Sequence, residues 1–412
     1  MIKAYWPELA APVDGMRNRH MPASRLVAIA VRVALADGTK EHLPQQFGVS
    51  QIRSLAKIKD RKITDFVIGN SRDDSPLIRS SARLEKWLKY SRDENPAGFL
   101  PVQLSRFAMG SPDLYSLLLW ISNRARDRPN NPDEEGELAK SARLLISWGH
   151  WFAADKAKLA NTVYYECVKE GAPSVVAITR GLKAVPEENN PPLARLPNAE
   201  QLEKFLALPQ KGIEEWDWSS LANDEKGNPD KERKRILGRV VFRVIWNKEL
   251  LLYAQRHYLA DRFRDYDPSE KDMWEDYNCP WDYDHILAHY YTYYKQGKMK
   301  KFSGKWVGTI GNLRAWPAED NRSDQKDLAK DKIKTEALAG SFLEKTEIPQ
   351  FSCGASVRDK ADDALSFAMA CWQRTVRIYK DWFDSLDIKN LLKPTELSES
   401  APKPLRGTET ET

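Results

Sequence analysis

Apolar residues in the first 170 or so positions recur every three or four residues, the period of amphipathic α-helices. The segment SRLVAIAVRVALADG (24–38) offers Ser24 as a cap, an apolar body and Gly38 as a stop signal. The pattern continues in PDLYSLLLWISNRARD (112–127) and AKSARLLISWGHWFAADKAKLANTVYYECVKEG (139–171). Residues 1–185 are therefore predicted to form an α-helical domain that serves partner or target recognition.

The periodicity breaks at KAVPEENNPPLARLPNAE (183–200), which is rich in proline and polar residues and predicts a linker over 186–200. A second domain is expected over 201–390. Near its end, six large apolar residues recur at helical spacing and predict an amphipathic helix: Leu365, Met369, Trp372, Val376, Tyr379 and Phe383. Residues 391–412 have almost no large apolar side chain and are predicted to be a disordered tail.

The middle of the second domain changes pattern. A helix pair is expected after the polar loop NDEKGNPDKERK (223–234), with LLYAQRHYLADRF (251–263) on the second helix. WDYDHILAHYY (281–291) then reads as a strand, and VGTIGNLRAW (307–316) as a short strand after a turn. PAEDNRSDQKD (317–327) carries a helix-start signature. The predicted order is strand, long loop, strand, helix, inside a mainly α protein.

Composition excludes several classes. The longest strongly apolar run, LLLWI (117–121), is far shorter than the roughly 20 residues of a membrane helix, so no membrane association is expected. The N-terminus lacks the apolar core of a signal peptide, which favours the cytoplasm. The four cysteines lie far apart without a CxxC pair, which argues against a zinc knuckle and a disulfide framework.

The net charge of +5 is small, so the distribution of basic residues matters more than their total. The segment KQGKMKKFSGK (295–305) contains no acidic residue and lies between the two predicted strands. A solvated surface is an ordinary explanation for such a cluster. Its position between the strands instead favours contact with an anionic partner by five lysines: Lys295, Lys298, Lys300, Lys301 and Lys305.

Charged and polar residues are unexpected in the first predicted strand, because a buried strand avoids unpaired charge. Asp282, Asp284 and His285 occur there, the second predicted strand supplies Asn312, and Asn321 follows nine residues later. This order resembles the HNH, or ββα-metal, nuclease finger, here over about residues 281–335. The run DYDHI, then Asn, then NRSD, is similar to the HNH domains of CRISPR-guided nucleases. Residues 236–335 look most like the C-terminal nuclease domain of the GmrSD modification-dependent restriction proteins.

The resemblance implies a role for each residue. His285 is expected to be the general base that deprotonates water, since an imidazole titrates near neutral pH. Asp284 and Asn321 are expected to bind Mg²⁺ or Mn²⁺ through oxygen, because hard cations prefer oxygen ligands. Asn312 is expected to orient the His285 imidazole or its backbone, with Asp282 in support. Arg322 joins the lysines as a predicted nucleic-acid contact.

The resemblance thus implies a metal-dependent DNA endonuclease that acts in bacterial restriction or antiphage defence. The sequence shows no pattern typical of the nucleotide-sensing domain of GmrSD proteins, so a protein partner is expected to supply sensing or nucleotide-dependent activity. Two alternatives stay open. One is a binding subunit of a defence complex with an inactive finger, although the complete set of residues counts against it. The other is an RNase, since a phosphodiesterase of this kind does not require deoxyribose.

Overall fold

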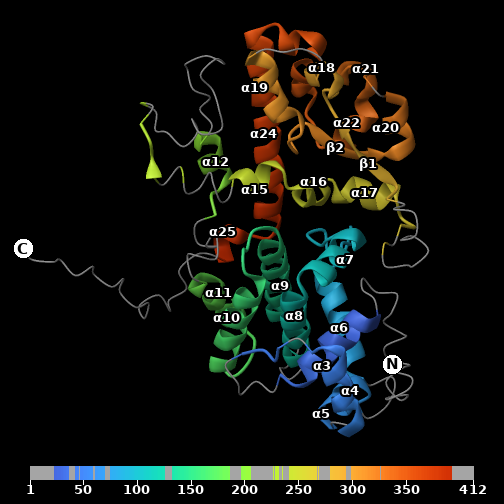
Figure 1. Ribbon diagram of the computed structural model, residues 1–412, viewed down its shortest axis with the longest axis vertical. Helices are drawn as coiled ribbons and strands as arrows, with labels where there is room; N and C mark the ends of the chain where they lie inside the picture. Colours follow the sequence, from blue (N-terminus) through green and yellow to red (C-terminus); the bar gives the residue numbers. More distant parts are fainter. Residues whose placement is uncertain are drawn as a thin grey trace, which may run out of the picture.

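A computed structural model of the chain defines a mainly helical protein, and its described residues contain one two-stranded sheet (Figure 1). The described ranges are 23–36, 42–45, 47–58, 61–69, 75–125, 132–185, 196–205, 226, 228–231, 234, 241–266, 268, 279–293, 298–324 and 326–391. Within them, no helix is long and apolar enough to cross a membrane. All four cysteines are free thiols.

The first half of the chain forms a group of helices, as their periodicity predicts. Three of its described helices have an N-cap side chain: Ser75, Asp155 and Ser174 each accept a hydrogen bond from a backbone N–H of the first turn. Ser24 lies inside the first described helix and is not its cap. The helices are α3 (Ala23–Ala34), α4 (Val49–Ile58), α5 (Arg61–Val67), α6 (Pro76–Leu88), α7 (Pro101–Gly110), α8 (Pro112–Arg124), α9 (Pro132–Trp151), α10 (Lys156–Lys169) and α11 (Val175–Ala184).

The second half surrounds the sheet with shorter helices and ends in one long helix. The break at Gln255, between two short helices, divides the segment that was expected to be a single helix. The elements are α12 (Ala199–Phe205), α15 (Phe242–Ile245), α16 (Lys248–Ala254), α17 (Arg256–Arg262), α18 (Tyr290–Tyr293), α19 (Lys298–Val307), α20 (Ala318–Asp324), α21 (Ala329–Lys332), α22 (Thr335–Gly340), η7 (Lys345–Glu347), α23 (Ile348–Phe351), η8 (Gly354–Arg358), α24 (Ala361–Ser385) and α25 (Ile388–Leu391).

The sheet consists of β1 (Trp281–His285) and β2 (Leu313–Pro317), which pair antiparallel. In their register Asp284 lies opposite Arg314, and His285 lies opposite Leu313. Helix α20 follows β2 directly. Strand, strand and helix therefore occur in the predicted order. The connection between the strands, which we predicted to be a long loop, instead contains α18 and α19. One side of α19 is buried through Phe302, Trp306 and Val307. The segment is helical because this spacing places its apolar side chains on one side and its lysines elsewhere.

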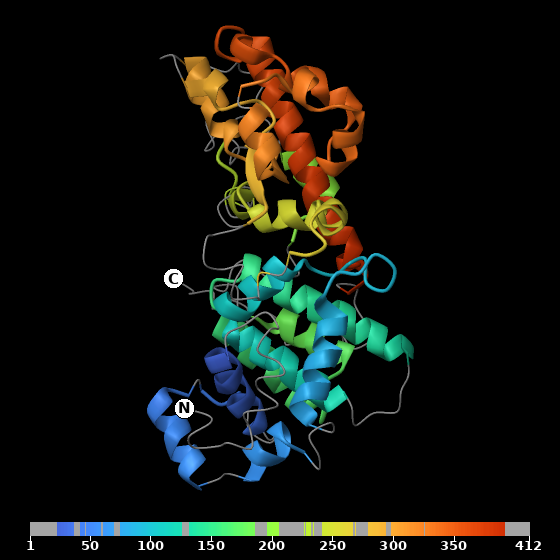
Figure 2. The ribbon, with the colours of Figure 1, turned by 90° about the vertical axis from the view of Figure 1, so that its right-hand side faces the viewer.

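Helix α24 spans much of the length of the molecule, from beside α19 to the helices of the N-terminal half (Figures 1 and 2). Trp382 near its C-terminal end is fully buried and packs on Trp151 and Phe152 of the N-terminal half. Its indole N–H also donates to Ser147 Oγ at 3.1 Å. One continuous set of buried apolar side chains joins the two halves.

The predicted domain boundaries stay predictions. Residues 186–195 of the expected linker lie outside the described residues, whereas 196–198 are described and lead into α12. Residues 392–412, nearly all of the expected tail, also lie outside them.

Candidate active site

His285 is the last residue of β1, and its imidazole is largely buried beside that of His289, with 5.7 Å between ring centroids. Burial is the largest cause that lowers the pKa of His285 to about 4, and His289, Lys332 and Lys248 act in the same direction. Asp284 opposes them. The imidazole is therefore neutral at pH 7 and able to accept a proton.

Asn312 is fully buried and holds the turn that follows His285. Its Oδ1 accepts the Leu287 N–H at 2.8 Å, and its Nδ2 donates to the carbonyls of Leu287 at 3.0 Å and Val307 at 2.9 Å. The Ile286 N–H also donates to the Asn312 carbonyl at 2.8 Å. These contacts fix the backbone after His285 and do not involve the imidazole, so Asn312 is a positioning residue.

Asp284 is buried, with only 4% of its surface exposed, and two cationic side chains surround its carboxylate. Arg314 Nε donates to Oδ2 at 2.7 Å, and Lys332 Nζ donates to Oδ1 at 2.8 Å and to Oδ2 at 3.0 Å. The side chains of both cations are fully buried. Lys332 Nζ also donates to the His285 carbonyl at 2.6 Å. The carboxylate is thus the centre of a buried ionic network at the end of β1.

Asp282 lies two residues earlier and faces the same side of β1, because strand side chains alternate. Its side chain is 41% exposed. Asn321 Nδ2 on α20 lies 3.4 Å from Asp282 Oδ2, and the Nε of the exposed Arg322 lies 3.8 Å from the same oxygen. The structure therefore places Asn321 next to Asp282, the residue predicted to have only a supporting role.

Sequence reasoning missed Arg314 and Lys332, which hold Asp284. The strand register carried a signal for Arg314, since it is the cross-strand partner of Asp284. Lys332 comes from α21, 48 residues after Asp284, and nothing local in the sequence connects the two.

The predicted lysines fall on α19 or just before it. Lys301 is exposed and Lys305 is half-buried. Lys298 and Lys300 lie on the first turn of the helix, but their side chains, and all of Lys295, lie outside the described residues. Contact of these residues with nucleic acid stays a prediction.

The donor chemistry bears on whether a divalent cation fits this site. Within the described ranges, no three or more His, Cys, Asp or Glu side chains come together as a metal site. Asp284 does not fit as a ligand, since both of its oxygens accept hydrogen bonds from cations. Asp282 and the Asn321 amide do fit, because they are oxygen ligands close to solvent.

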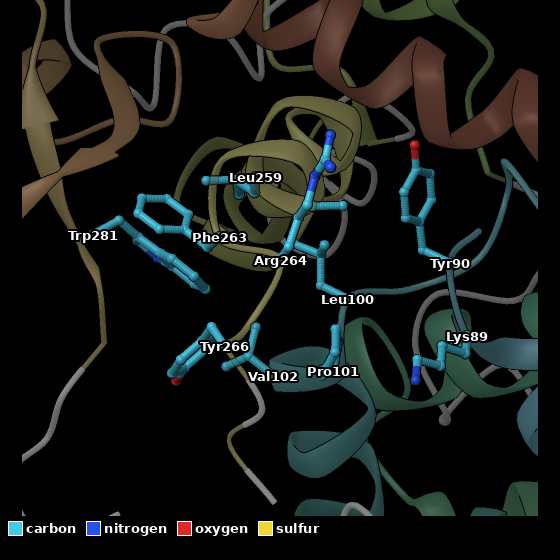
Figure 3. Close-up of a pocket in the computed structure, with 11 residues that line it drawn as sticks. Lys89, Tyr90, Leu100, Pro101, Val102, Leu259, Phe263, Arg264, Tyr266 and Trp281 are labelled. Carbon is cyan, nitrogen blue, oxygen red and sulfur yellow. The ribbon is translucent and has the colours of Figure 1, made fainter. Parts of the chain in front are cut away.

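A pocket of about 150 Å³ lies at the other end of β1 (Figure 3). Trp281, Phe263 and Tyr266 line one side, and Leu100 and Tyr90 of the N-terminal half line the other. His285 lies four positions after Trp281, so their Cα atoms are roughly 13 Å apart along the strand. The pocket has the size that accommodates one aromatic ring. Among the described residues, its lining contains no carboxylate, histidine or cysteine side chain.

Comparison of the chain with protein-family models, with curated proteins and with solved structures gives no match. The function must therefore be argued from the residues and their geometry.

Proposed function

We propose that the protein is a metal-dependent nuclease that uses His285 to activate water for phosphodiester hydrolysis. The observation that carries the proposal is a neutral, largely buried imidazole at the end of β1, in an antiparallel pair of strands whose second member leads directly into α20. The resemblance of the DYDHI, Asn312 and Asn321 segments to ββα-metal nucleases supports it, as does the position of Asn321 beside β1.

The roles of the residues follow from their contacts. His285 takes the proton of the attacking water, which its low pKa allows at any pH well above 4. Lys332 holds the backbone at the base through the His285 carbonyl, and Asn312 holds the backbone just after it through Leu287. A bound Mg²⁺ or Mn²⁺ would supply polarisation of the phosphate and stabilisation of the leaving oxygen. The exposed Arg322 and Lys301 are proposed to contact phosphates.

DNA is the proposed substrate, in a defence role that includes a protein partner, and both points rest on the resemblance alone. A second candidate is a nucleic-acid-binding subunit without cleavage activity. One observation favours it, namely that Asp284 is paired with two cations and does not present free oxygens to a metal.

The test is cleavage by the purified full-length chain. Supercoiled plasmid, modified phage DNA and RNA are each incubated with and without Mg²⁺, and the products are separated on gels. We expect metal-dependent cleavage of DNA, and His285→Ala is expected to lower the rate by about 10²–10⁴-fold, the usual loss on removing a general base. His42→Ala, which removes an exposed histidine, is the matched control and should cleave normally.

Each result separates the candidates. Cleavage of RNA but not of DNA would show that RNA is the substrate. Binding to DNA without cleavage of any substrate would favour the second candidate. Full activity in His285→Ala would rule out this histidine as the base.

A further inference from the structure

Asp282 and Asp284 lie on one face of β1 but differ in their surroundings. Asp284 is buried, whereas the Asp282 side chain is 41% exposed. In the resemblance to ββα-metal nucleases, the carboxylate next to the histidine, Asp284, is the metal ligand. The contacts of this chain give that residue another function.

The Asp284 carboxylate accepts hydrogen bonds from Lys332 at both oxygens and from Arg314 at Oδ2. A divalent cation bound to the same oxygens would lie within a few ångströms of a buried ammonium and a buried guanidinium. Like charges repel strongly in a poorly solvated site. Binding there would require one of two fully buried side chains to leave.

Lys332 also connects Asp284 to the base. Its ammonium donates to Asp284 and, at 2.6 Å, to the carbonyl of His285. The network thus restrains the backbone of His285 from one side, and Asn312 restrains the following turn through Leu287. The contacts of Asp284 are those of a residue that positions another.

Asp282, in contrast, is partly exposed and makes weaker contacts. Its ionic contact with Arg322 spans 3.8 Å, the Arg322 side chain is 77% exposed, and exposed pairs of this kind contribute little. The Asn321 amide is close enough to share a cation with Asp282, and rotation of the amide would present its oxygen. A hard cation could therefore bind here without disrupting a buried contact.

We propose that Asp282, together with Asn321, is the carboxylate that binds the divalent cation, and that Asp284 is a positioning residue held by Lys332 and Arg314. The inference rests on the proposed function, since the cation belongs to it. It reassigns the ligand within the same face of β1.

The two carboxylates allow a matched comparison in the full-length chain. Mn²⁺ binding is measured by electron paramagnetic resonance, with and without a short DNA duplex, alongside the melting temperature without metal. Asp282→Asn should weaken Mn²⁺ binding by about tenfold or more and leave the melting temperature unchanged. Asp284→Asn should lower the melting temperature and leave the affinity for Mn²⁺ within about twofold.

Lys332→Met provides a second variant in case Asp284→Asn does not fold, and Lys330→Met on the same helix is its exposed control. Lys332→Met should lower the melting temperature without tightening Mn²⁺ binding. Tighter binding in Lys332→Met would mean that Lys332 competes with metal for Asp284, and would overturn the inference. Unchanged Mn²⁺ binding in Asp282→Asn, or no binding by the wild type, would also overturn it.

The outcome is independent of cleavage. A wild-type chain that binds Mn²⁺ through Asp282 but cuts no substrate would remove the proposed nuclease function and leave the ligand assignment standing. If the wild-type chain cleaves nucleic acid and Mn²⁺ binding is lost only in Asp284→Asn, the nuclease function stands and the assignment of Asp282 as the ligand is wrong.

Discussion

His150 is a titratable residue of the N-terminal half whose protonation is opposed by its surroundings. It lies on α9 with Nδ1 2.7 Å from Ser111 Oγ. Its ring packs on Phe107 in a T-shaped arrangement. Burial, followed by the charges of Lys156 and Arg106, lowers the pKa of His150 to about 4. In the unfolded chain the same imidazole titrates near pH 6.5.

This difference predicts a loss of stability in mild acid. Between pH 6.5 and 4 the unfolded chain binds a proton at His150 that the folded chain does not, so the free energy of unfolding decreases as the pH falls through this window. The loss from this residue reaches up to about 3 kcal/mol at pH 4. In His150→Phe the decline between pH 7 and 4.5 should be shallower, as measured by urea unfolding.

Ser111→Ala is the control for that measurement, because it removes the hydrogen bond and keeps the titrating ring. It should lower stability at every pH by a similar amount. If His150→Phe and the wild type lose stability in parallel, His150 is not responsible for the acid sensitivity.

The residues of the candidate site were only partly predictable. Alternation along a strand places Asp282 and Asp284 on one face of β1 and His285 on the other, and this follows from WDYDHI alone. Which of the two carboxylates is buried does not follow. That is decided by Lys332, which is brought to Asp284 by the path of α20 and α21 and not by any local pattern.

The contact of the turn before β2 with α24 sets the position of Asn312. Gly311 packs so closely on α24 that an added Cβ would lie 1.9 Å from the Cys371 carbonyl oxygen. The fully buried Arg374 of α24 donates to the carbonyls of Ile310, Gly311 and Leu313 around it. Only glycine allows this approach of backbone to helix.

We expect Gly311→Ala to separate the turn from α24, because backbone atoms cannot yield as a flexible side chain does. The free energy of unfolding should fall by about 3 kcal/mol, the upper end of the usual range for overpacking. The bonds of Asn312 to the turn after His285 should weaken with it. Thermal unfolding and cleavage are the measurements. Gly308→Ala, where an added Cβ meets no atom within 4 Å, should behave as the wild type in both.

Elements with one apolar side were predicted better than the connections between them. The spacing of Trp372, Val376 and Tyr379 predicts α24, and these side chains are buried. The lysine-rich segment of α19 was predicted to be a loop, although Phe302 and Trp306 stand four residues apart, at helical spacing. A helix with one charged side and one buried side satisfies both patterns.

The contacts between the two halves of the molecule indicate that they stabilise each other. Besides Trp382, Gln103 of α7 donates to the Glu249 carbonyl of α16 at 2.9 Å, and Arg106 bonds to the Glu249 carboxylate. Phe99 packs on Tyr253 with 5.4 Å between ring centroids. The predicted linker near residue 190 therefore joins segments that share one core, which the proline-rich sequence did not indicate.

Truncation of Trp382 tests this coupling. Trp382→Ala removes a fully buried indole from between α9 and α24, and such losses typically cost about 3–5 kcal/mol. Because the core is continuous, we expect the whole chain to unfold in a single transition at a lower temperature, followed by calorimetry and circular dichroism. Trp246→Ala, at a tryptophan that is 42% exposed, should change the melting temperature much less. Two separate transitions, with only one shifted by Trp382→Ala, would show instead that the halves fold independently and that Trp382 stabilises only one of them.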